Sequence, residues 1–165
     1  MNTKIYVFDH LPTTIEEFKA LKEASLQTPF DCVALTLLAL LHYESNPTLS
    51  IALLNVLKGP SPLSEYEKQF IRERLNKKGY KVRSFFEGST PENNYQANIP
   101  YCLCVYETPY SYPQEHWATL YVKSSGADHL RSIKLRCKPS TGQWFLNEIQ
   151  CLADIRLPQE SDPWA

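Results

Sequence analysis

The chain has 165 residues, a formal net charge of −1 from 17 Lys and Arg against 18 Asp and Glu, and 43% hydrophobic residues. This length and apolar content predict one globular domain over residues 1–165. The balanced charge argues against a dedicated nucleic-acid binder, which would show a basic composition or a concentrated basic face. The five cysteines include no Cys-x-x-Cys pair, so no disulfide framework is indicated.

The N-terminal segment lacks the apolar run of a secretory signal, because it reaches Asp9 after a few apolar residues. The longest apolar stretch, residues 32–41, has about half the length of a membrane span. We therefore expect a cytoplasmic protein that makes no membrane contact.

Cap signals followed by apolar residues at helical spacing predict four helices within residues 1–79. A capping box at Thr13 and Glu16 starts the first helix, and Pro29 stands at the first position of the second, which is apolar all round and should be buried. Gly59 closes the third helix. The predicted ranges are 14–25, 29–41, 47–58 and 65–76.

After Gly79 the hydrophobic period changes to two, which is typical of strands. The predicted strands are residues 80–86, 101–107, 117–123, 132–138 and 143–149, with residues 5–8 as a candidate edge strand. Helices first and strands later predict an α+β fold. About four N-terminal helices would pack on a C-terminal antiparallel meander within residues 80–157, followed by a short tail.

A cysteine nucleophile is one hypothesis for function. Cys32 lies in the first turn of the predicted second helix, where the helix dipole favours a thiolate, and His116 directly precedes a predicted strand. Residues 27–32 and 116–120 resemble segments of the papain-like cysteine peptidases that process bacterial leader peptides. The resemblance implies Cys32 as nucleophile, His116 as base and Gln27 as oxyanion donor.

Three features depart from that peptidase pattern, and one of them is Asp31, which stands beside Cys32 at the fourth helical position and should raise the pKa of the thiol. The spacing between Gln27 and Cys32 is one residue shorter than usual, and Lys138 stands where such a peptidase carries the residue that orients its histidine. A buried cysteine on a helix face is the simpler explanation of Cys32.

A metal site is a weaker hypothesis. Cys102 and Cys104 alternate along one predicted strand, but structural zinc sites place paired cysteines on a turn where both sulfur atoms converge. Packing in the core explains the pair better. We therefore predict no metal and no cofactor.

Two segments are candidates for binding. Lys134 and Arg136 share one face of a predicted strand, with Arg131 nearby, and suit an acidic partner or serve as an ordinary solvated face. Tyr110 and Tyr112 lie in a proline-bounded turn, where rigid aromatic side chains suit recognition or cover the end of the sheet.

Segments spread over nearly the whole chain resemble an uncharacterised bacterial family, a domain of unknown function. They are residues 57–60, 86–95, 109–112, 125–128, 134–136, 140–146, 153–156 and 162–165. The resemblance implies no particular activity. It directs attention to the loop 86–95, the turn 109–113 and the hairpin 128–136 as one polar and aromatic surface.

The leading expectation is therefore a non-catalytic binding module whose partner is another protein or a small acidic ligand. Its expected contact residues are Tyr95, Tyr110, Tyr112, Arg131, Lys134 and Arg136. The alternative is a papain-like cysteine hydrolase of peptide or amide bonds that uses Cys32 and His116. The sequence leaves the oligomeric state open.

Overall fold

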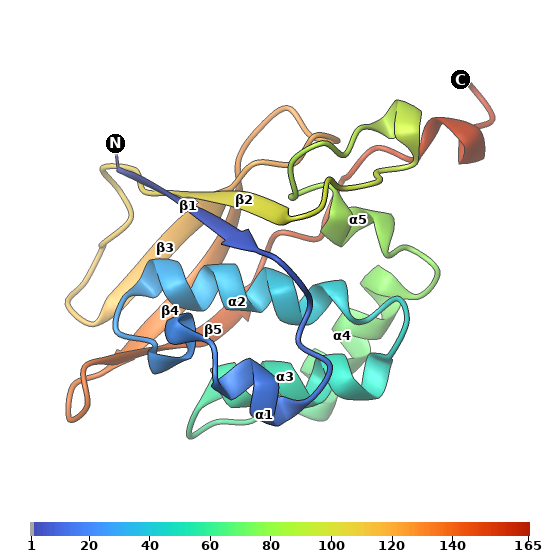
Figure 1. The fold of residues 1–165 in the computed structure, drawn as a ribbon. Coiled ribbons are helices and arrows are strands. Elements are labelled where there is room, and N and C mark those ends of the chain that lie inside the picture. The colour runs from blue at the N-terminus through green and yellow to red at the C-terminus, as the bar shows by residue number, and fades with distance from the viewer. Residues whose placement is uncertain (1) are drawn as a thin grey trace.

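The computed structural model describes residues 2–165 and contains, within them, five α-helices and one five-stranded antiparallel sheet (Figure 1). The strands lie in the order β1 (Thr3–Phe8), β2 (Tyr101–Tyr106), β3 (Trp117–Val122), β4 (Arg131–Lys138) and β5 (Gln143–Ile149). The helices are α1 (Ile15–Lys19), α2 (Pro29–Leu41), α3 (Pro47–Lys58), α4 (Glu65–Leu75) and α5 (Tyr80–Arg83). Short 3-10 turns occur at Lys22–Ser25, Pro91–Asn93 and Gln159–Ser161. The predicted α+β class is confirmed.

Local capping explains why α2, α3 and α4 begin where the sequence predicts. The side chain of Thr28 accepts the Asp31 amide and Asn46 accepts the Leu49 amide, while Ser64 and Glu67 form a reciprocal capping box. Gly59 ends α3 with a φ of 62°, and a Cβ there would lie 2.5 Å from the Phe145 ring. Glycine is therefore required both by the backbone conformation and by the close approach of β5.

The first predicted helix, residues 14–25, is divided in the structure. Thr14, rather than Thr13, caps α1 by accepting the Glu17 amide, and the Glu17 carboxylate in turn accepts the Thr13 amide. The chain then continues into the Lys22–Ser25 turn, which ends at Leu26 with a φ of 56°.

Residues 80–86, predicted as a strand, contain helix α5 instead. Contacts with a distant segment stabilise this helical turn: the Tyr80 ring stacks on Tyr95 at 5.6 Å, and the Arg83 guanidinium donates to the carbonyls of Asn94 and Tyr95. The sheet also takes its first strand from the N-terminus, since Tyr6 of β1 pairs with Leu103 of β2. The candidate edge strand over residues 5–8 is therefore confirmed within β1, whereas the order of helices first and strands later holds only for β2 to β5, which follow all five α-helices found within residues 2–165.

Helix α2 is the centre of the core. It lies between the sheet and helices α1 and α3, against β2 to β5 on one side and α3 on the other (Figure 1). Its side chains are buried all round, as its uninterrupted apolar run predicts. No helix within residues 2–165 combines the length and the apolar composition that crossing a membrane requires.

The opposite face of the sheet is open at β1. Tyr6 and Phe8 are buried, whereas the alternate residues Ile5 and Val7 are 67% and 57% exposed. Because successive side chains of a strand point to opposite faces, these two apolar side chains lie on the face away from α2.

Strands β2 and β3 are staggered, and this stagger positions the candidate sites. Only Val105↔Val122 and Tyr106↔Tyr121 pair them. Beyond the overlap, other segments occupy the free edges: the Glu87 amide donates to the Cys102 carbonyl at 2.8 Å, and the Thr119 amide donates to the Ser111 carbonyl at 2.7 Å. The first half of β2 and the chain that follows β3 therefore diverge from each other, which forms a fork between them.

Candidate functional site

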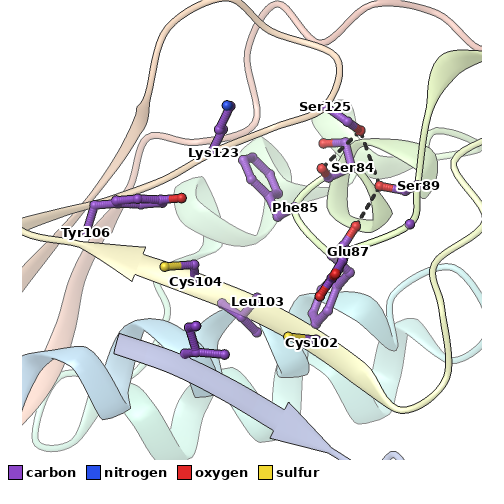
Figure 2. A pocket seen from close by; sticks show the side chains of 13 residues that line it. Ser84, Phe85, Glu87, Ser89, Cys102, Leu103, Cys104, Tyr106, Lys123 and Ser125 are labelled. Carbon is purple, nitrogen blue, oxygen red and sulfur yellow. Dashed lines mark hydrogen bonds between the residues drawn. The ribbon is translucent and has the colours of Figure 1, made fainter. Parts of the chain in front are cut away.

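The fork between β2 and β3 encloses a recess of about 330 Å³, called the fork recess below (Figure 2). Cys102, Cys104 and Tyr106 of β2 and Ile5 of β1 form one side. The segment 84–89 and the residues that follow β3 form the other. The full lining comprises Ile5, Ser84, Phe85, Phe86, Glu87, Gly88, Ser89, Cys102, Leu103, Cys104, Tyr106, Lys123 and Ser125.

Hydrogen bonds among serine residues hold the wall of the fork recess. The Ser84 hydroxyl accepts from Ser124 at 2.7 Å and donates to the Lys81 carbonyl at 2.6 Å. The Ser89 hydroxyl donates to the Phe86 carbonyl at 2.7 Å and lies 3.2 Å from the Ser125 hydroxyl (Figure 2). These hydroxyls therefore form hydrogen bonds within the wall and stabilise it.

Cys102 and Cys104 lie on the open face of the sheet and not in the core as the sequence predicts. Leu103 and Val105, which alternate with them, are the buried residues of β2. Burial, followed by a hydrogen bond to Glu87, raises the pKa of Cys102. Burial and a hydrogen bond with Cys104 raise the pKa of Tyr106. The Cys102 thiol is therefore neutral near pH 7 and weakly nucleophilic.

Two opposite charges flank the fork recess. Glu87 and Lys123 are exposed and lie at different ends of the wall formed by the segment 84–89 and the residues after β3 (Figure 2). Neither takes part in any of the ion pairs found within residues 2–165. Sequence reasoning missed the fork recess, although the alternation of Leu103 and Val105 with less apolar residues indicates which face of β2 is open.

A second surface lies at the other end of the stagger and is called the aromatic-basic surface. It consists of Tyr110, Tyr112, Trp117, Lys134, Arg136 and Lys138. Tyr110 is 83% exposed, and Tyr112 donates to the Glu107 carboxylate at 2.8 Å. Trp117 connects the turn to β4, since its amide donates to the Gln114 carbonyl and the Arg136 guanidinium lies 5.0 Å from its ring centroid.

Basic side chains also border a recess beside β4. It measures about 280 Å³ and is lined by Lys58, Arg136, Lys138 and Phe145, among others. The buried Lys58 ammonium donates to Glu67 at 2.8 Å and to the Asn147 carbonyl at 3.2 Å, so its charge is compensated. Arg136 and Lys138 form no ion pair within residues 2–165 and supply the free positive charge here.

Two predicted contact residues have structural roles instead. Tyr95 is fully buried, and its hydroxyl donates to the Arg156 carbonyl at 2.7 Å. The Arg131 guanidinium donates to the carbonyls of Ala153 and Asp154, both at 3.1 Å. Both side chains attach the segment after β5 to the body of the protein. Arg131 also lies at the opposite end of β4 from Arg136, so the six predicted residues do not form one surface.

The structure places the predicted catalytic residues in unlike environments. Cys32 is fully buried, and burial, with a smaller contribution from Asp31, raises its pKa. His116 is partly exposed, with its Nε2 atom 3.5 Å from the Glu115 carboxylate. The Gln27 amide donates to the Ser25 carbonyl at 3.1 Å. No hydrogen bond among residues 2–165 connects these three side chains.

Potential metal ligands are dispersed. Across residues 2–165, no three His, Cys, Asp or Glu side chains gather in a way that could hold a metal ion. Cys32 and Cys151 are buried, whereas Cys102, Cys104 and Cys137 are half-buried, and all five are free.

Residues 10–159 match the family described as domain of unknown function DUF6935, and the chain belongs to this family. No curated protein and no solved structure shows a significant match to the chain. The match agrees with the near full-length resemblance inferred from the sequence.

Proposed function

We propose that this protein is a non-catalytic binding module that holds an acidic segment of another protein on the aromatic-basic surface. The observation that carries the proposal is the exposure of Tyr110 on a turn that is internally hydrogen-bonded. Aromatic side chains with few rotatable bonds gain large contact area at low entropic cost, which is why they dominate binding hot spots.

The turn that presents Tyr110 is held at three points. The Ser111 hydroxyl accepts the Thr108 amide at 2.9 Å, and the Thr108 hydroxyl accepts the Tyr110 amide at 3.2 Å. The buried Ser111 also accepts the Thr119 amide through its carbonyl. The backbone that carries Tyr110 is therefore fixed before a partner arrives, so only the side chain needs ordering on binding.

The charges favour an acidic partner. Lys134, Arg136 and Lys138 alternate along β4 and form no ion pair within residues 2–165. Glu107 and Glu115 on the turn would repel the carboxylates of a partner. These carboxylates would therefore lie over β4, and the apolar groups of the partner would lie on Tyr110. Charge complementarity of this kind mainly sets specificity and association rate.

A peptide selection tests this function. The intact protein is used to select from a random-peptide display library, and the selected peptides are measured by fluorescence anisotropy. We expect acidic peptides to be enriched, and Tyr110→Ala and Arg136→Gln each to weaken their binding about 10-fold or more. Tyr66→Ala and Lys19→Gln are matched controls on exposed helix positions. Selection of peptides without acidic bias, or full affinity in both surface variants, would refute the proposal.

The cysteine hydrolase ranks second because Cys32 is fully buried and its thiolate is disfavoured. We also propose a cytoplasmic location, as expected from the sequence. The half-buried free thiols of Cys102, Cys104 and Cys137 suit a reducing compartment.

A further inference from the structure

The fork recess is separate from the aromatic-basic surface, and the proposed function does not use it. The stagger of β2 against β3 leaves one free stretch of edge at each end of the overlap. Ser111 covers the stretch beside β3, where the aromatic turn lies, and Glu87 covers the stretch beside β2. The fork recess lies at this second position.

The shape of the fork recess is held by backbone hydrogen bonds. Besides the Glu87 amide on Cys102, the Ser125 amide donates to the Ser84 carbonyl at 2.9 Å and the Asn98 amide donates to the Glu87 carbonyl at 2.9 Å. The segment 84–89 is therefore bonded to β2, to the loop 94–100 and to the residues after β3. A recess with such walls exists before a ligand binds, which lowers the ordering cost of binding.

The interior of the fork recess suits an apolar group. Ile5 is 67% exposed and contributes hydrocarbon surface, and the nearly buried Phe85 ring lies in the wall beside it. The neutral thiol of Cys102 behaves as a small apolar group with a weak donor. The hydroxyls of the serines in the wall already form hydrogen bonds with protein atoms, so they offer little to a polar ligand.

The charged groups at the fork recess are one acid and one base. Glu87 at one end of the wall suits an ammonium group, and Lys123 at the other end suits a carboxylate (Figure 2). A ligand with only one charge would pair with either Glu87 or Lys123 and leave the other side chain to solvent. The combination of an apolar interior with opposite charges at its two ends therefore selects a molecule that carries both charges on an apolar body.

We propose that the fork recess binds a small zwitterion with an apolar body, of which an amino acid with an apolar side chain is the simplest example. Its ammonium group faces Glu87, its carboxylate faces Lys123, and its apolar body lies over Ile5 and Cys104, which pair across β1 and β2. The volume of about 330 Å³ is at the lower end of the range for small-molecule sites. No covalent step is involved.

The test pairs changes in the ligand with changes in the protein. Chemical-shift titrations of the full chain use leucine, phenylalanine, 6-aminohexanoate and the dipeptide Leu-Leu, which differ in the separation of their charges. For the best binder, N-acetylation removes the ammonium charge and amidation removes the carboxylate charge. We expect saturable shifts at residues 84–89, 102–106 and 123–125, and a loss of about 3-fold or more from each modification, as for exposed ion pairs.

Two variants test which charge of the ligand faces Glu87 and which faces Lys123. In Glu87→Gln the effect of N-acetylation should disappear while that of amidation remains, and in Lys123→Gln the reverse should hold. Glu92→Gln, an exposed acid in the same loop outside the fork recess, is the matched control. Cys104→Phe fills the recess from an open strand face and should abolish binding without lowering the melting temperature. Absence of saturable shifts with all four zwitterions, or modification effects that persist unchanged in both charge variants, would overturn the proposal.

Discussion

Burial divides the five cysteines into two groups with different expected chemistry. Cys32 and Cys151 are fully buried, and burial raises the pKa of Cys151 to about 12 and that of Cys32 higher still. We predict that iodoacetamide alkylates Cys102, Cys104 and Cys137 in the native protein at least about 100-fold faster than Cys32 and Cys151, whose access requires opening of the core. Mass spectrometry of tryptic peptides measures each rate. Fast native alkylation of Cys32 would contradict this and would favour the hydrolase hypothesis.

His42 should make the stability of the protein depend on pH. It is buried with its Nε2 atom unbonded, and burial lowers its pKa below 6.5, although a hydrogen bond to the Pro12 carbonyl partly opposes this shift. The unfolded chain therefore binds the proton first, so stability is complete above pH 6.5 and is lost as the pH falls towards the folded pKa. The limiting slope is about 1.4 kcal/mol per pH unit.

Urea unfolding between pH 7.5 and 5 measures this effect. His42→Leu should flatten the dependence of the unfolding free energy on pH, whereas His129→Gln, at an exposed position, should leave it unchanged. Equal slopes for His42→Leu and the wild-type protein would show that other groups cause the pH dependence.

The segment after β5 is attached by buried apolar residues and by a few hydrogen bonds from distant side chains. Tyr95 donates to the Arg156 carbonyl, Arg131 donates to those of Ala153 and Asp154, and the Arg156 amide donates to the Gly126 carbonyl. Tyr95→Phe keeps the ring but removes one hydrogen bond, so we expect a loss of about 1 kcal/mol in unfolding free energy. Hydrogen exchange within residues 151–157 should rise at the same time.

Tyr80→Phe is the matched control for that substitution. Tyr80 stacks on Tyr95, but none of the hydrogen bonds found within residues 2–165 involves its hydroxyl. A loss of stability as large in Tyr80→Phe as in Tyr95→Phe would mean that the bond to Arg156 does not hold this segment.

Helices with caps were predictable because their signals are local. Thr28, Asn46 and Ser64 each accept an amide three residues later, whatever the rest of the chain does. Residues 80–83 have no such signal, and their alternation resembles a strand. Their conformation depends on Tyr95 and Asn94, more than ten residues away, which a reading of the local pattern does not include.

The candidate sites were less predictable than the elements, because sites depend on register across the whole sheet. The sequence indicated that Tyr110, Lys134 and Arg136 face outward, since alternation and turn chemistry determine this locally. The offset between β2 and β3 is a property of the assembled sheet, and it alone creates the fork recess. Tyr95 was predicted as a contact residue because it lies in a loop, but its ring is buried in the core, which the loop position does not reveal.

The predicted single domain can be tested on the whole molecule, since α2 contacts both the sheet and α3. Far-ultraviolet circular dichroism reports mainly on the helices, while Trp117 and Trp144 report on the sheet in a Trp164→Phe background, because Trp164 is 93% exposed. If the helices and the sheet share one core, the two probes should give coincident urea transitions.

Leu37→Ala strengthens that test. Leu37 is fully buried in α2, so its truncation should lower both transitions by the same amount, about 2–5 kcal/mol, whereas the exposed Lys19→Ala should shift neither. Separate transitions, or a loss confined to the helical signal, would mean that the helices and the sheet unfold as independent units. Coincident shifts would mean that any ligand bound at the open face of the sheet stabilises the helices as well, because binding to the folded state alone raises the free energy of the whole cooperative unit.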